Sequence, residues 1–162
     1  MNRLPERVDL TLRINGAGHA IRVEPRCTLA EAIRDECGLT AHTGCEHGVC
    51  GSCTVVVDGE PVRACLMFAI QGRGRDIRTV EGLATGEALH PLQQAFIDHH
   101  ALQCGFCTPG FLMLSAAVLA KDPDLDAAGI DAALASNLCR CTGYRNIVAA
   151  VRDAAARMRG RP

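Results

Sequence analysis

This chain has few aromatic residues and almost no net charge. Aromatics make up 3% of its 162 residues, tryptophan is absent, and 17 basic residues nearly balance 18 acidic ones. A near-neutral chain gives no electrostatic case for a nucleic-acid partner. The longest largely apolar run, from Phe111 to Ala120, is about half the length that a bilayer-spanning helix needs. We therefore expect no nucleic-acid partner and no membrane span.

The first seven residues also lack export features. They read Met-Asn-Arg-Leu-Pro-Glu-Arg and contain neither an apolar segment nor a twin-arginine pair. The default expectation is a cytoplasmic protein. In that compartment thiols stay reduced, so clustered cysteines serve as metal ligands more often than as disulfides.

Cysteine is abundant, and eight of the ten cysteines form two compact quartets. The first quartet has the spacing of a plant-type [2Fe-2S] loop, with its fourth thiol supplied later by a separate segment. The second combines a C-x-x-C pair with a C-x-C pair. In chain order, the two quartets are Cys45, Cys50, Cys53 and Cys65, then Cys104, Cys107, Cys139 and Cys141.

The two quartets differ in how closely they specify a metal. Gly44, Gly48 and Gly51 lie among the first ligands, where a chain that wraps a cluster needs positive φ and close backbone approach. In the second quartet, Cys107 precedes an expected helix start, whose dipole favours an anionic cluster. From the residues alone, the second quartet indicates metal without fixing its kind. Two all-cysteine zinc sites that only stabilise the fold would use the same eight thiols, and this alternative stays open.

Hydrophobic periodicity divides the chain into a sheet-forming half and a helical half. Alternating residues predict a hairpin over 8–14 and 20–23, and a Thr28–Glu31 capping box predicts a helix over 29–36. Further strands are expected at 54–57, 61–65 and 76–80. The glycine- and arginine-rich segment 71–86 is interpreted as a connector. The two remaining cysteines, Cys27 and Cys37, are expected to pack rather than to bind metal.

The second half has helical periodicity. Helices are expected to start at Pro91 and Thr108, a third to carry Ile130, Leu134 and Leu138 on one stripe, and a fourth to span 144–158. In the fourth, Ile147, Val151, Ala154 and Met158 are predicted to face inward. The predicted fold class is α+β, with a ferredoxin-like domain at 1–80 and an all-α four-helix-bundle domain at 81–162.

Three runs of sequence resemble the iron-sulfur subunit of the xanthine oxidase family of molybdenum hydroxylases. They are GCEHGVCGSCTV at 44–55, QCGFCTPG at 103–110 and NLCRCTGY at 137–144. The resemblance extends from about Val8 to Met158. Before the first cluster, Leu39-Thr40-Ala41-His42-Thr43 replaces the expected Leu-Thr-Gly run, which has one more residue, so the path of the loop there is left open.

This resemblance implies a β-grasp, plant-ferredoxin-like domain and two [2Fe-2S] clusters. The first quartet would lie nearer FAD and the second nearer a molybdopterin, expected as the cytosine dinucleotide, with Gln103 contacting the pterin. FAD and molybdopterin would belong to a medium and a large partner subunit, in a heterotrimer or a dimer of heterotrimers. The implied function is electron transfer from molybdenum to FAD during hydroxylation of an N-heteroaromatic, purine, aldehyde or related molecule.

Some features missing from the sequence agree with this division of labour. The run from Gly72 to Ile77 does not complete a G-x-G-x-x-G fingerprint, so no dinucleotide flavin site is expected here. No substrate pocket and no catalytic residue are predicted on this chain either. A stand-alone ferredoxin-like carrier and a zinc-stapled binding module remain the alternatives, and the substrate is not specified.

Overall fold

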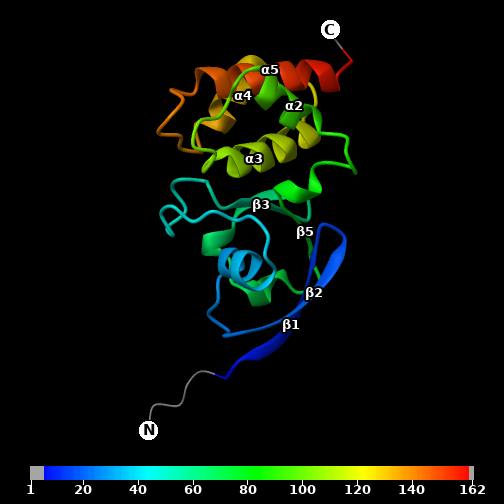
Figure 1. Cartoon of the computed structure of the whole chain (residues 1–162), viewed down its shortest axis with the longest axis vertical. Helices are drawn as coiled ribbons and strands as arrows, with labels where there is room; N and C mark the ends of the chain where they lie inside the picture. Colours follow the sequence, from blue (N-terminus) through cyan, green and yellow to red (C-terminus); the bar gives the residue numbers. More distant parts are fainter. Residues whose placement is uncertain (1–5, 161–162) are drawn as a thin grey trace.

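The structure, a computed structural model, describes residues 6–160 and stacks a helical layer above a sheet-bearing half (Figure 1). Of the seven N-terminal residues inspected for export features, residues 1–5 lie outside the described part. Within residues 6–160, no helix combines the length and apolarity needed to cross a bilayer.

The first half contains a five-stranded mixed sheet in the order β2-β1-β5-β3-β4. Its first and last hairpins are antiparallel, β1 and β5 run parallel, and β5 joins β3 antiparallel. The strands are β1 (Val8–Ile14), β2 (Ala17–Val23), β3 (Thr54–Val57), β4 (Glu60–Arg63) and β5 (Asp76–Arg78). The predicted strands are all present, although β2 begins before Ala20, β4 ends before Cys65 and β5 ends before Val80.

Both hairpins turn on the residues that the sequence indicated. Asn15 and Gly16 have φ of 52° and 80°, and Asp58 and Gly59 have 50° and 86°. Positive φ at both central residues is the geometry of a two-residue hairpin turn that matches strand twist. The tight turns leave β1 and β3 in register with their partners.

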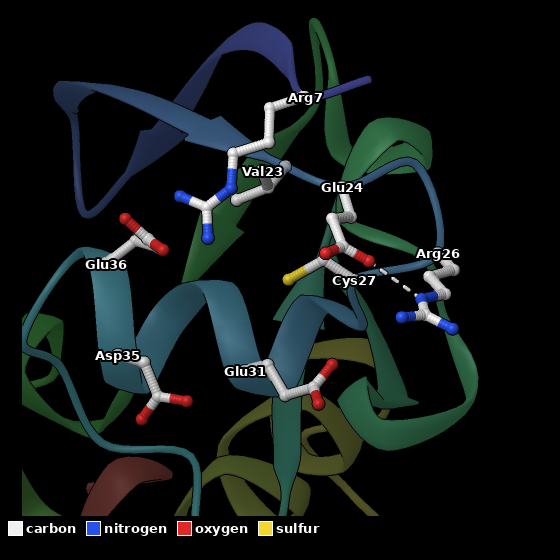
Figure 2. Close-up of a pocket in the computed structure, with 8 residues that line it drawn as sticks. All are labelled: Arg7, Val23, Glu24, Arg26, Cys27, Glu31, Asp35 and Glu36. Atoms are coloured by element: carbon white, nitrogen blue, oxygen red, sulfur yellow. Dashed lines mark hydrogen bonds and ion pairs between the residues drawn. The ribbon is translucent and has the colours of Figure 1, made fainter. Parts of the chain in front are cut away.

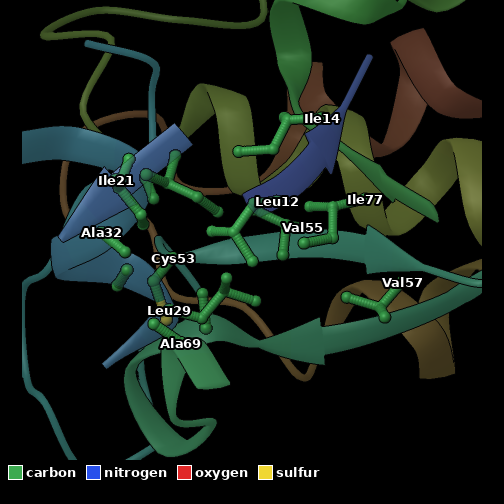
Figure 3. Packing of buried hydrophobic residues seen from close by; sticks show 14 of the residues in the cluster. Leu12, Ile14, Ile21, Leu29, Ala32, Cys53, Val55, Val57, Ala69 and Ile77 are labelled. Carbon is green, nitrogen blue, oxygen red and sulfur yellow. The ribbon is translucent and has the colours of Figure 1, made fainter. Parts of the chain in front are cut away.

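The predicted 29–36 helix is present but changes its winding. Thr28 Oγ1 accepts a hydrogen bond from the amide of Glu31 at 3.2 Å, and Glu31 Oε2 accepts one from the amide of Thr28 at 2.7 Å. This capping box starts α1 (Leu29–Glu31), which continues as a π-helix, η1 (Ala32–Glu36). The helix lies against the sheet, where Leu29 and Leu12 pack within one buried core (Figure 3).

Three short 3-10 helices were not predicted. They are η2 (Ala64–Leu66), η3 (Ala69–Gly72) and η4 (Val80–Gly82). Cys65 therefore lies on a 3-10 turn rather than on a strand. The segment interpreted as a connector contains β5 and η4 as well as irregular chain.

Four helices make up the second half. They are α2 (Pro91–Asp98), α3 (Thr108–Lys121), α4 (Ala127–Leu134) and α5 (Arg145–Met158). Their apolar faces share a second core that includes Phe96, Phe111 and Ile147. Two expectations are wrong, since Leu138 lies beyond α4 with 49% exposure and Met158 at the end of α5 is 41% exposed. Both stand at or past a helix end, where periodicity no longer determines the buried face.

The helix α3 joins the two halves. It lies directly above β3 in Figure 1, and Met113 and Ala117 form a small buried cluster with Val56. Because β3 follows the first cysteine loop and α3 begins beside Cys107, this packing brings the two quartets to the same end of the interface.

Candidate iron-sulfur sites

The first quartet is arranged by one irregular loop and one 3-10 turn. Cys45, Cys50 and Cys53 lie on the loop between η1 and β3, and Cys65 comes from η2 after β4. The loop takes positive φ at Glu46 (56°), Gly48 (86°) and Gly51 (72°). Gly44 does not have a positive φ. A glycine is favoured there because a Cβ would lie 3.2 Å from a ring carbon of Phe106, which is closer than an ordinary contact.

Backbone amides stabilise one thiolate of this loop, whereas burial opposes another. The amide of Cys50 donates to Cys45 Sγ at 3.4 Å. This amide and that of His47 lower the pKa of Cys45 to about 6. Cys53 is 1% exposed, and burial raises the pKa of its thiol to about 11 beside Cys65. The loop thus presents a thiolate at its rim and a desolvated thiol at its base.

The second quartet is built from two helix ends. Cys104 and Cys107 precede α3, and Cys107 is its N-cap residue. Cys139 and Cys141 follow α4, and Cys141 Sγ lies 3.5 Å from Cys104 Sγ. The amide of Cys139 donates to the Tyr144 hydroxyl at 3.0 Å, which anchors the C-x-C arm to the start of α5. The N-terminal dipole of α3 favours negative charge here, as the sequence indicated.

The thiols of the second site also differ in pKa. Burial raises the pKa of Cys107 to about 12, and the neighbouring Cys139 thiol adds to this. Burial alone would raise the pKa of Cys139 as well. However, a contact of 3.1 Å with Thr142 Oγ1 and the amides of Cys141 and Thr142 lower it overall. The Cys104 contact raises the pKa of the exposed Cys141.

In each quartet the strongest interactions between thiols join two pairs. The side chains pair as Cys45 with Cys50, Cys53 with Cys65, Cys104 with Cys141, and Cys107 with Cys139. Within residues 6–160, no three Cys, His, Asp or Glu side chains are arranged to hold one ion. Two pairs of thiols are the donor set that a [2Fe-2S] rhomb takes, two for each iron. The residues therefore fit the group that the spacing predicts.

Direct hydrogen bonds join the two cysteine loops. The amide of Leu138, next to Cys139, donates to the carbonyl oxygen of Cys50 at 2.9 Å. The buried Asn137 Nδ2 donates to the carbonyl oxygen of Gly51 at 3.3 Å. Arg63 Nη2 donates to the carbonyl oxygen of Ser136 at 2.7 Å, and its Nε reaches that of Gly48 at 3.4 Å. A cysteine of one quartet is thus one hydrogen bond from the residue next to a cysteine of the other.

The other residues that the sequence singled out, Gln103, Cys27 and Cys37, are not among the four pairs of thiols. Gln103 is exposed beside Cys104. Cys27 and Cys37 are half-buried against the first core, and burial raises the pKa of both thiols. Cys27 also borders a cavity of about 370 Å³ together with Glu31, Asp35 and Glu36 (Figure 2). None of the eight clustered cysteines lines this cavity.

Comparison with known proteins gives matches over both halves. Residues 12–84 match the 2Fe-2S iron-sulfur cluster binding domain, and residues 79–152 match the [2Fe-2S] binding domain. The nicotine 6-hydroxylase small subunit of Paenarthrobacter nicotinovorans is 53% identical over 150 residues, covering 92% of this chain and 90% of that protein. The caffeine dehydrogenase subunit gamma of Pseudomonas sp. (strain CBB1) is 50% identical over 148 residues, with 89% of each chain covered.

A solved structure agrees over nearly the whole length. Quinoline 2-oxidoreductase from Pseudomonas putida 86 contains a chain with 46% identity and a TM-score of 0.89. The match covers 97% of this chain and 99% of that one. The identities, the coverage and the two matched domains agree with the three sequence runs. The chain belongs to the small iron-sulfur subunits of the xanthine oxidase family of molybdenum hydroxylases.

Proposed function

We propose that this chain is the electron-transfer subunit of a heteromeric molybdenum hydroxylase. It would carry electrons from a molybdopterin on a large subunit, through two [2Fe-2S] clusters, to FAD on a medium subunit. The observation that carries the proposal is the pairing of eight thiols in two quartets whose loops are joined by the Leu138–Cys50 hydrogen bond. Each cluster, when bound, exchanges one electron at a time.

The protein's own residues hold and tune the two sites. The first quartet, Cys45, Cys50, Cys53 and Cys65, would ligate one cluster, and Cys104, Cys107, Cys139 and Cys141 the other. The amides that favour the Cys45 thiolate would also stabilise the negative charge of a bound cluster. Hydrogen bonds to cluster sulfurs raise the reduction potential of the cluster. We propose domain limits of 1–80 and 81–162, with the four helices forming the bundle that characterises the second domain.

Exposure supports an order for the two sites. Cys53 and Cys65 are buried, whereas Cys104 and Cys141 are exposed at the surface beside Gln103. A partner's cofactor could approach this open edge without displacing protein. We therefore assign the second quartet to the molybdopterin side, with Gln103 as the pterin contact and the cytosine dinucleotide as the expected form. The first quartet is assigned to the FAD side, in a cytoplasmic heterotrimer or a dimer of heterotrimers.

Relatives guide the choice of substrate. Proteins named for nicotine, caffeine and quinoline are 46–53% identical to this chain, whereas a subunit named for aldehyde oxidation is 40% identical. We propose an N-heteroaromatic ring as the substrate of the complex. The pocket that selects it would lie on the large subunit.

Anaerobic reduction of the purified complex tests this function. A panel of N-heteroaromatics, purines and aldehydes is added singly, and cluster reduction is followed by electron paramagnetic resonance (EPR). At least one heteroaromatic should reduce both clusters within the turnover time, while the isolated small subunit should respond to dithionite alone. Clusters that stay oxidised in the complex with every compound, or a chain that isolates without partners, would count against the proposal.

A further inference from the structure

A histidine ahead of the first cysteine loop contacts the second. His42 comes three residues before Cys45, within the stretch where the sequence departs from the expected Leu-Thr-Gly run. Its Nδ1 lies 2.8 Å from the carbonyl oxygen of Phe106, which stands between Cys104 and Cys107. The two rings are stacked, with centroids 4.8 Å apart and an interplanar angle of 14°. One side chain thus makes both a polar and an aromatic contact across the two sites.

The Phe106 ring continues this contact onto the first loop. A Cβ added to Gly44 would lie 3.2 Å from Phe106 Cε1 and 3.5 Å from Cys50 Sγ. The ring therefore lies against the backbone beside a first-site thiol, although its own residue belongs to the second site. Phe106 is 44% exposed, so burial alone does not fix its position.

The hydrogen bond shows which ring nitrogen of His42 carries a proton. A carbonyl oxygen can only accept, so Nδ1 must carry a proton. This holds for the neutral Nδ1–H tautomer and for the charged ring alike. The contact does not require the histidine to be charged.

We propose that His42 is a positioning residue that holds the C-x-x-C arm of the second cluster site against the first. The inference rests on the proposed function, since it requires clusters in both quartets. Leu138 and Asn137 already tie the C-x-C arm to Cys50 and Gly51. His42 supplies the corresponding tie for the arm of Cys104 and Cys107, so both arms of the second site are held by the first loop or by the residues just before it.

Three variants and a matched control test the proposal in the purified complex. His42→Ala removes both contacts, His42→Gln keeps a donor for the carbonyl, and Phe106→Leu removes the ring but keeps the carbonyl. The control is His47→Ala, because His47 Nδ1 contacts the carbonyl oxygen of Cys45 within its own loop at 2.6 Å. Iron release to a chelator and midpoint potential are followed for each cluster by EPR.

The expected pattern separates the two sites. His42→Ala should release second-cluster iron about fivefold faster, the equivalent of roughly 1 kcal/mol for one hydrogen bond, and should shift that cluster's potential more than the first one's. His42→Gln should recover part of the loss, and Phe106→Leu should act on the same cluster. His47→Ala should affect the first cluster alone.

Failure of this inference is distinguishable from failure of the proposed function. If the unaltered complex shows both clusters and His42→Ala leaves the second one's release rate and potential unchanged, His42 has no positioning role. An equal effect of His42→Ala and His47→Ala on both clusters would also overturn it. If the unaltered complex lacks a second [2Fe-2S] signal, the proposed function itself fails.

Discussion

Both cysteine sites bring four thiols together, but they draw them from segments of different length. The first draws three thiols from one loop of nine residues, 45–53, and closes with Cys65 on the next 3-10 turn. The second joins the start of α3 to the segment that follows α4, so its two cysteine pairs lie about thirty residues apart in the sequence. The first is buried at its base, whereas the second leaves Cys104 and Cys141 exposed.

The two sites also differ in the local features that shape them, and they are in direct contact. The first loop gains much of its shape from its own glycines and amides. The second site contacts the first through Leu138, Asn137 and the close approach of Gly110 to Gly51. A change in either loop should therefore be felt at the other site.

Replacing one thiol at each site is expected to have the largest effect. Cys139→Ser should abolish one of two reduced-cluster EPR signals, because a hydroxyl is a poorer ligand for iron than the soft thiolate. Cys53→Ser should abolish the other and stop turnover with acceptors that draw on FAD, while substrate still reduces molybdenum. Cys27→Ser is the control and should keep both signals. Two intact signals in Cys139→Ser would refute the ligand assignment.

Adding a side chain where the two halves are in close contact should have the next largest effect. A Cβ on Gly110 would lie 2.3 Å from the carbonyl oxygen of Gly51 and 3.0 Å from Ser52 Cα. Gly110→Ala should therefore destabilise the chain by about 3 kcal/mol, although alanine favours a helix over glycine. The apparent Tm, measured by circular dichroism, should fall by roughly 6–12 °C.

Gly18→Ala is the matched control for that substitution. A Cβ there meets only Thr11 Cγ2 at 3.8 Å, an ordinary contact, and its φ is not positive. Its Tm should stay within a few degrees of the unaltered chain. Equal Tm values for the Gly110 and Gly18 variants would show that the contact between α3 and the first loop does not stabilise the pair.

Arg63 offers a smaller test of the tie between the loops. Arg63→Met removes its donors to the carbonyl oxygens of Ser136 and Gly48 and to Thr54, at an expected cost of about 1 kcal/mol. Arg73→Met is the control, because Arg73 Nη2 donates to the carbonyl oxygen of Asp9, in the same half, at 3.2 Å. Urea unfolding should place the Arg63 variant below the Arg73 variant. The reverse order would contradict a role for Arg63 between the sites.

The smallest effect concerns the two cysteines outside the quartets. Burial raises the pKa of Cys27 and Cys37, so the reactive thiolate is a minor form until the pH exceeds the ordinary thiol value near 9. In the folded chain both should react with iodoacetamide more slowly than free cysteine at pH 8, and faster as the pH rises. Mass spectrometry of the labelled chain reports the rates. Labelling at or above the free-cysteine rate would show exposed, activated thiols.

Local signals predicted much of this structure, whereas contacts between distant segments had to be observed. Asn15-Gly16 and the Thr28–Glu31 box each determine their geometry within four residues, and both predictions are confirmed. The 3-10 turn that carries Cys65 has no such local signal. Helical periodicity gave α2 to α5 but failed at Leu138 and Met158, where the helix ends.

The contacts between the two sites could not be predicted from the sequence, because no local signal marks them. His42 and Phe106 are 64 residues apart, and Asn137 and Gly51 are 86 apart. Neither pair has a spacing rule, because tertiary packing alone brings them together. The clustering of the eight cysteines was predictable from motif spacing, but the contacts between the two sites were not.

Metal analysis of the complex, combined with EPR of its reduced form, tests the central claim most directly. Two [2Fe-2S] clusters require four irons and four labile sulfides for each copy of this chain. We predict that content, a brown chromophore, and two distinguishable signals that each integrate to one spin per chain. Zinc in place of iron, or iron for a single cluster in a fully folded chain, would contradict it.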